Sequence, residues 1–127
     1  MAPAGIDAAR AARAERLALA LSGVIAVAIA VLTLMPAPSL PAAPGGDKLH
    51  HFVAFGALVL PVVAVRPRQA LWAVPVAIGY GGAIELIQPH VGRHGEWADA
   101  VANALGACMG AALGWGLHRG ARLLTGR

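Results

Sequence analysis

Polar residues of types suited to acid–base, metal or anion-binding chemistry recur at short spacings in the second half of this sequence. They are Asp47, Lys48, His51, Glu85, Gln88, Arg93, Asp99 and Asn103. Three pairs, at positions 47 and 51, 85 and 88, and 99 and 103, are three or four residues apart, so each pair would project from one face of a helix. We therefore expect three helices to present polar faces to one shared site.

Two kinds of chemistry suit these residues. In a binding pocket, Lys48 and Arg93 would hold a phosphate while carboxylates and the amides of Gln88 and Asn103 bond hydroxyl groups. In an enzyme, His51 would be general base or nucleophile oriented by Asp47, and Arg93 would stabilise phosphoryl charge. Glu85 or Asp99 would then act as an acid or as a ligand to a divalent cation such as Mg²⁺, Ca²⁺ or Mn²⁺.

The composition places these residues in a membrane protein. The chain has 127 residues, of which 58% are hydrophobic and 13% charged, and its mean hydropathy is +0.68. Soluble domains contain about 25% charged residues. The apolar residues form four runs separated by short stretches that hold most of the Arg, Asp, Pro and His. This layout predicts several transmembrane helices and no separate soluble domain.

We predict an all-α polytopic fold, a single membrane domain over residues 1–127 with a bundle of four transmembrane helices. The spans are residues 17–35, 49–65, 70–88 and 98–117, each about long enough to cross a bilayer core of roughly 30 Å. A segment rich in proline and glycine, residues 35–46, ends the first span, and Asp47 is expected to cap the second. The later connections are short, which makes the second, third and fourth spans antiparallel neighbours.

The basic residues predict the orientation. Eight of the ten, all except Lys48 and Arg93, fall on one side of the predicted spans: Arg10, Arg13, Arg16, Arg66, Arg68, Arg119, Arg122 and Arg127. By the positive-inside rule both termini are cytoplasmic, in a multi-pass protein of the bacterial inner membrane. The high isoelectric point is then a topological signal, and nucleic acid is not an expected partner because no basic patch is interleaved with aromatic residues.

The same orientation gathers the polar residues at the outer side. A charge facing lipid near a helix centre costs about 2.5–3.5 kcal/mol, less near the interface, so such groups face a bundle interior or a wet cavity. Glu85 is the deepest of them, and His51, Arg93 or Asn103 could each be its partner. The sequence thus predicts an outward-facing polar pocket.

Each polar residue also has a purely structural interpretation. Asp47 could be only a helix cap, Asp99 only a first-turn acid favoured by the helix dipole, and Arg93 a side chain reaching lipid phosphate. Glu85 and Gln88 could form an interhelical clasp, and His51 could bond a backbone carbonyl. We expect His50 to face the interface. His90, His94 and Glu96 are expected to form a solvated loop.

Small residues in the last span predict close helix packing. Gly106, Gly110 and Gly114 form a smooth ridge that fits packing within the chain, with a homodimer face as the alternative. The segment GYGG, residues 79–82, offers a matching groove. Cys108 is interpreted as a small packing residue. A cleaved secretory signal ending near residue 43 is an alternative for the first span, although its apolar run exceeds the usual 7–15 residues.

Three motifs in order resemble those of VanZ-like membrane proteins. They are DKLHH followed by Phe52, AIELIQ, and an arginine followed by Asp-x-x-x-Asn-x-x-Gly, which here are Asp47, Lys48, His51, Glu85, Gln88, Arg93, Asp99, Asn103 and Gly106. The resemblance covers residues 47–114. It implies a small bacterial membrane protein of a family whose founding member is associated with low-level resistance to the glycopeptide teicoplanin and whose biochemical activity is not established.

Three hypotheses for function follow. The first is a protein that binds or remodels an anionic or glycosylated, lipid-linked ligand of the cell envelope. The second is an outer-leaflet hydrolase or transferase acting on a lipid phosphate or lipid-linked glycan. The third is a scaffold or homodimer locked by the polar groups. Membrane lipids are expected partners in all three, and a transporter is disfavoured because no charged path leads to the cytoplasmic side.

Overall fold

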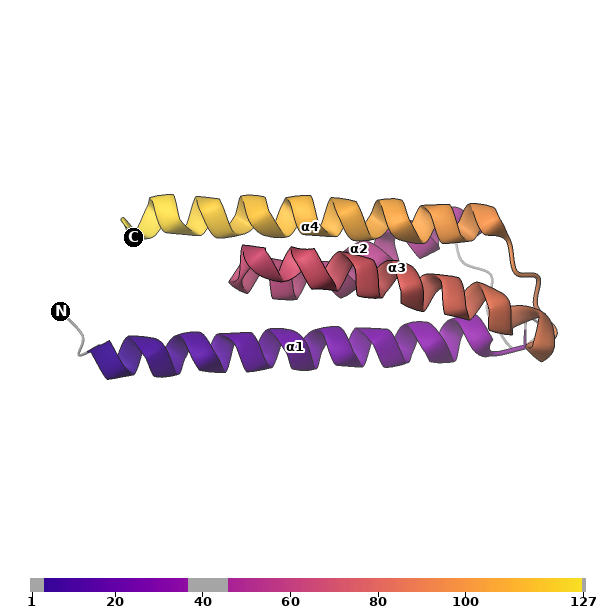
Figure 1. Cartoon of the computed structure of the whole chain (residues 1–127), viewed down its shortest axis with the longest axis horizontal. Helices are drawn as coiled ribbons and strands as arrows, with labels where there is room; N and C mark the ends of the chain where they lie inside the picture. The colour runs from indigo at the N-terminus through magenta and orange to yellow at the C-terminus, as the bar shows by residue number, and fades with distance from the viewer. Residues whose placement is uncertain (1–3, 37–45, 127) are drawn as a thin grey trace.

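The computed structural model describes residues 4–36 and 46–126, which form a bundle of four long helices (Figure 1). These are α1 (Ala4–Leu34), α2 (Asp47–Val65), α3 (Ala70–Ile87) and α4 (Trp97–Thr125), with two 3₁₀ turns, η2 (Pro67–Gln69) and η3 (Gln88–Val91). All four helices are long and apolar enough to cross a bilayer. The predicted all-α polytopic fold is thus confirmed.

The first and last helices, α1 and α4, are longer than the predicted spans. α1 has 31 residues and α4 has 29, whereas the apolar runs cover residues 17–35 and 98–117. The added turns hold Arg10, Arg13 and Arg119 among alanines and leucines, which are all strong helix formers. Hydropathy predicts only the apolar run of each helix, and the helix continues beyond that run because the flanking residues also favour helix.

Asp47 is not the cap of α2, contrary to our expectation. Gly46 occupies the N-cap position with φ 75, and no side chain caps the helix. A positive φ suits glycine because it has no Cβ, so the chain enters α2 through Gly46 and Asp47 becomes its first residue. The expected proline-rich break and the alternative cleavage site fall on residues 37–45, outside the described residues.

α2 is the central helix of the bundle. It packs most extensively against α4 and also contacts α1 and α3. Its buried residues Phe55, Val59, Val62 and Val63 form the middle of the apolar core. α1 and α3 are more exposed than α2 over their apolar length, as expected for helices that meet lipid.

The glycine ridge of α4 lies directly against the backbone of α2. A Cβ added to Gly106 would overlap the carbonyl of Phe52, and one added to Gly110 would overlap that of Gly56. A Cβ on Gly114 would come within 2.9 Å of the Leu60 carbonyl oxygen. This face of α4 is therefore occupied within the same chain, and a homodimer would need another face.

The expected groove in α3 is not the partner of this ridge. Cβ atoms added to Gly79 and Gly82 would meet nothing within 4 Å. Gly81 alone in that segment faces α4, where an added Cβ would come within 2.8 Å of Asn103 Nδ2. Spacing identifies a ridge of small residues, but the order of helices around the bundle decides which helix covers it.

The two ends of the bundle differ in charge. α1 and α3 end, and α2 and α4 begin, at one end, which we call the polar end. Both chain termini lie toward the opposite end (Figure 1), which carries most of the arginines. There Arg66 pairs with Glu15 at 3.1 Å, and Gln69 donates to the same carboxylate at 2.6 Å.

The tight α2–α4 contact predicts opposite effects for two glycines of α4. Gly110→Ala should lower the free energy of unfolding by about 1–3 kcal/mol, because the added methyl overpacks the backbone contact. Gly116→Ala meets no atom within 4 Å and should leave stability unchanged or raise it by up to about 1 kcal/mol. Thermal unfolding in mild detergent measures both, and equal effects would contradict the described packing.

Candidate functional site

The polar end brings together residues from three helices and one loop. Asp47, Lys48 and His51 come from the first turns of α2, Glu85 from the last turn of α3, and Asp99 and Asn103 from the first turns of α4. Glu96 precedes α4 and is its N-cap residue. The close approach of α2 and α4 places the two starting ends side by side, and α3 ends against them.

His51 is the centre of this cluster. Its side chain is 4% exposed, and its Nδ1 lies 2.8 Å from Oδ1 of Asn103. An amide oxygen can only accept a hydrogen bond, so Nδ1 carries a proton and donates it. In the neutral ring the lone pair is then on Nε2. Asn103 thereby sets both the tautomer and the orientation of the imidazole.

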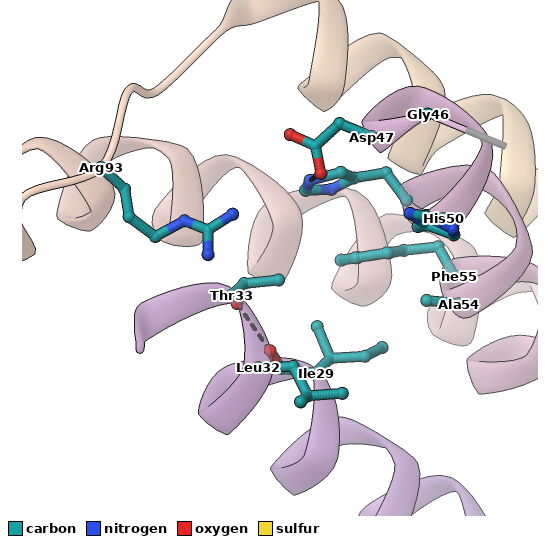
Figure 2. Close-up of a pocket in the computed structure, with 10 residues that line it drawn as sticks. Ile29, Leu32, Thr33, Gly46, Asp47, His50, Ala54, Phe55 and Arg93 are labelled. Carbon is teal, nitrogen blue, oxygen red and sulfur yellow. Dashed lines mark hydrogen bonds and ion pairs between the residues drawn. The ribbon is translucent and has the colours of Figure 1, made fainter. Parts of the chain in front are cut away.

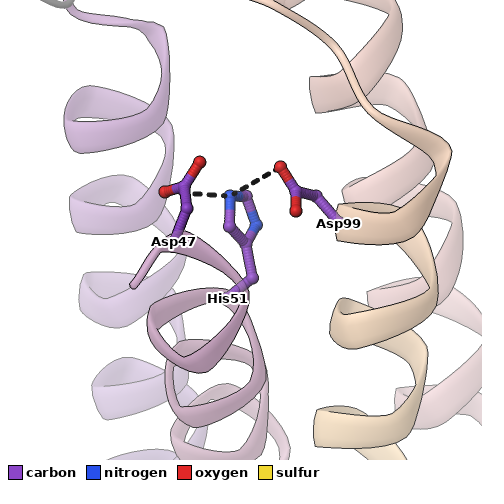
Figure 3. A group of neighbouring side chains, drawn as sticks. All are labelled: Asp47, His51 and Asp99. Atoms are coloured by element: carbon purple, nitrogen blue, oxygen red, sulfur yellow. Dashed lines mark ion pairs between the residues drawn. The ribbon is translucent and has the colours of Figure 1, made fainter. Parts of the chain in front are cut away.

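Three carboxylates surround the ring. Asp47 Oδ1 lies 3.9 Å and Asp99 Oδ2 lies 3.8 Å from Nε2, on either side of it (Figure 3). Glu85 Oε1 lies 3.9 Å from Nδ1. All three distances exceed the 2.7–3.2 Å typical of hydrogen bonds. The carboxylates thus face the imidazole across gaps rather than bonding to it.

Lys48 links Asp99 to one further acidic residue, Glu96, at the edge of the cluster. Its ammonium lies 3.0 Å from Glu96 and 3.5 Å from Asp99. The Lys48 and Glu96 side chains are 57% and 54% exposed, so water screens this pair and it contributes little to stability. Asp99 is only 4% exposed, and its two oxygens are divided between Lys48 and His51.

Glu85 finds a partner that the sequence did not suggest. Of the three expected partners, His51 lies 3.9 Å from Oε1 of Glu85. The hydrogen bond comes from elsewhere, because Oε2 accepts it from the backbone N–H of Glu96 at 3.0 Å. Gly95 permits this because a Cβ there would overlap the carbonyl of Glu85, so only glycine lets the loop pass so close. Glu96 is exposed and precedes α4, as expected for a solvated loop residue, and in addition its main chain bonds Glu85 and its side chain bonds Lys48.

Gln88 and Arg93 bond the end of α1 and the residue after it, rather than the cluster around His51. Gln88 Nε2 donates to the carbonyl of Thr33 at 3.2 Å, and Arg93 donates to that of Met35 at 3.4 Å. The last carbonyls of a helix lack partners within it, which explains why these donors are directed there. Gln88 is 2% exposed and acts here as a helix–helix contact.

Arg93 also lines a pocket of about 520 Å³ between α1 and α2. Figure 2 shows its guanidinium pointing across the pocket toward the start of α2. Asp47, His50 and His51 form the polar wall with it, and an apolar wall consists of Ile29, Leu32, Ala54 and Phe55. His50, expected at the membrane interface, is exposed and belongs to this wall.

Several buried polar atoms of the site lack a hydrogen-bond partner among the described residues. They are Glu85 Oε1, Gln88 Oε1, Asp99 Oδ1 and Asn103 Nδ2. Asp99 Oδ1 is the one that Lys48 approaches at 3.5 Å. Buried polar groups are nearly always hydrogen-bonded. Four unpartnered atoms close together are therefore typical of a site that binds a ligand or an ion.

Comparison with protein families matches residues 10–118 to the family described as VanZ/LLP1. The matched segment includes every residue of the polar cluster and most of the four helices. No match to the chain is found among curated proteins or among solved structures.

The His51–Asn103 hydrogen bond predicts a single histidine tautomer. In ¹⁵N NMR spectra, His51 should be protonated at Nδ1, and Asn103→Ala should remove that preference and lower the free energy of unfolding by about 1–3 kcal/mol. His118 is an internal control because its Nδ1 faces the Ala64 carbonyl oxygen at 2.9 Å, far along α4 from the substitution. A wild-type His51 protonated only at Nε2 would contradict the geometry.

Proposed function

The chain belongs to the VanZ/LLP1 family, and we propose that this multi-pass membrane protein binds or remodels an amphipathic ligand of the cell envelope at its polar end. The ligand would carry an anionic or glycosylated head group and a lipid chain. The proposal is carried by one observation, the two-sided lining of the pocket between α1 and α2.

The apolar wall suits a lipid chain. Ile29 and Leu32 on α1 face Ala54 and Phe55 on α2 across the pocket, and binding sites are lined mainly by such side chains with few polar groups. α1 is also the least buried of the four helices over its apolar length. A lipid chain can therefore enter from the bilayer between α1 and α2 while its head group stays at the polar end.

The polar wall suits a phosphate or sugar. Arg93 uses one N–H for the Met35 carbonyl, and its remaining donors match a phosphate group. Asp47 is exposed, and its carboxylate can accept hydrogen bonds from sugar hydroxyls. Together these groups would distinguish a glycosylated or phosphorylated head group from an uncharged lipid.

The charge distribution supports an outward-facing pocket. Seven of the described arginines lie toward the end opposite the cluster: Arg10, Arg13, Arg16, Arg66, Arg68, Arg119 and Arg122. By the positive-inside rule that end is cytoplasmic, so both termini would lie on the cytoplasmic side of the bacterial inner membrane. The polar end would then meet envelope ligands at the outer leaflet, consistent with a role in resistance to the glycopeptide teicoplanin.

A second candidate function is an outer-leaflet hydrolase or transferase. It is favoured by the fixed tautomer of His51, because a neutral imidazole with its Nε2 lone pair directed toward two carboxylates has the form of a general base. Nε2 would accept the proton of an attacking water or hydroxyl group. Asp99→Asn separates the two functions, since binding should largely survive and acid–base turnover should not.

The proposed binding predicts a retained ligand. Native mass spectra of the gently solubilised protein should show a lipid or glycolipid adduct that Arg93→Ala reduces at least about tenfold, as expected when a charge-assisted contact is lost. Arg119→Ala is the matched control, because Arg119 stacks on Trp115 at the opposite end, 5.2 Å from its ring centre. Adducts equally abundant in both variants, or absent from wild type, would contradict the proposal.

A further inference from the structure

We propose that Asp47, His51 and Asp99 bind a divalent transition-metal ion, of the Mn²⁺ or Zn²⁺ class, at the mouth of the pocket. One ligand atom from each residue lies within 4.8 Å of the others. The inference deepens the proposed function and rests on it only for the head group that the ion would hold.

The orientation of His51 is that of a metal ligand. A histidine that binds a metal through one nitrogen commonly donates the N–H of the other to a carbonyl, carboxylate or water, which fixes the ring. Here Nδ1 donates to Asn103 Oδ1 at 2.8 Å. In the neutral ring Nε2 then holds the lone pair, and Asp47 and Asp99 lie on either side of it.

The distances around Nε2 fit an ion better than a proton. A protonated Nε2 would bond a carboxylate oxygen at about 2.7–2.9 Å, whereas the two oxygens stand at 3.8 and 3.9 Å. Ligand atoms about 2.1 Å from a tetrahedrally bound ion lie about 3.4 Å apart. Closing the two nitrogen–oxygen distances to this value needs a movement of about half an ångström. The two carboxylate oxygens lie within 4.8 Å of each other, so they would approach by up to about 1.4 Å.

A second observation independently indicates a missing positive charge. Asp99 Oδ1 and Glu85 Oε1 have no hydrogen-bond partner among the described residues, and their side chains are 4% and 9% exposed. Asp99 faces Nε2 of His51, and Glu85 faces Nδ1. A buried carboxylate must be paired with a cation or fully hydrogen-bonded. Lys48 pairs with Glu96 and Asp99, whereas Asp47 and Glu85 lie 3.9 Å from the nitrogens of His51. The acidic residues around the ring therefore favour a further cation.

The donor set selects the class of ion. Carboxylate oxygens alone suit Mg²⁺ and Ca²⁺, but an imidazole nitrogen shifts the preference toward Zn²⁺, Mn²⁺ and similar ions. Three protein ligands leave at least one coordination position open. Asp47 is exposed and lines the pocket together with Arg93, so the open position can accept a phosphate or hydroxyl oxygen of the bound head group.

A metal at Nε2 would also decide the role of His51. The lone pair that a general base requires would be bound to the ion, so His51 could not accept a proton there. Asn103 would then be a positioning residue, acting on the ion through the His51 ring.

Metal content tests the inference directly. The full chain in mild detergent is stripped with a chelator, reloaded with Zn²⁺ or Mn²⁺, freed of excess ion and analysed by inductively coupled plasma mass spectrometry. We expect about one ion per chain and a higher thermal midpoint after reloading, because an ion that binds the folded state stabilises it. Less than about a tenth of an ion per chain would overturn the inference.

Two matched pairs of variants locate the ion. His51→Ala should abolish retention while His50→Ala keeps it, and Asp99→Asn should abolish it while Glu96→Gln keeps it, although Lys48 contacts both acids. Asn103→Ala should weaken the affinity for the ion about 10–100-fold, as measured by competition with a chromophoric chelator. This variant keeps all three ligands, so it tests the site even if His51→Ala or Asp99→Asn does not fold. Equal retention within both pairs would overturn the assignment.

The same samples separate this inference from the proposed function. A lipid adduct that survives chelation and is lost in Arg93→Ala, with no metal bound, would overturn the metal site and leave ligand binding intact. Bound metal without any adduct would support the metal site and contradict ligand binding.

Discussion

The direct contact between the backbones of α2 and α4 is the constraint on which the rest of the structure depends. Gly106 and Gly110 let α4 approach the carbonyls of Phe52 and Gly56, closer than any side chain would allow. His51 immediately precedes Phe52, and Asn103 lies one helical turn before Gly106. The packing that joins the helices therefore also sets the 2.8 Å hydrogen bond between His51 and Asn103.

The polar end buries polar and charged side chains that helix packing alone does not need. His51, Glu85, Gln88, Asp99 and Asn103 are all buried, and ionisable groups inside a membrane protein are expensive unless they are paired or functional. Gln88 is explained by its bond to α1. The negative charges of the carboxylates around His51 are only partly paired with positive groups. Local arrangements that destabilise a fold in this way are concentrated at functional sites.

The sequence predicts the helices and most of the cluster, because apolar run length and three- or four-residue spacing are local properties. The predicted residues that the structure brings together are Asp47, Lys48, His51, Glu85, Asp99 and Asn103. The sequence does not predict contacts that depend on how the loop between α3 and α4 folds. Gly92 adopts a positive φ of 76 and Gly95 allows the close pass that delivers the Glu96 amide to Glu85. Likewise, a glycine ridge does not identify its partner helix, and the donors of Gln88 and Arg93 are directed to α1 because its last carbonyls are open there.

Accessibility of the polar end from outside the cell tests the central claim, that the cluster forms an outward-facing site. In a Cys108→Ala background, single cysteines are placed at His94, in the exposed loop before α4, and at Thr125, at the exposed end of α4. Intact cells are treated with a membrane-impermeant maleimide. We predict that the cysteine at 94 is labelled in intact cells and that the one at 125 is labelled only after permeabilisation. The reverse pattern would place the cluster on the cytoplasmic side and contradict a role in binding outer-leaflet ligands.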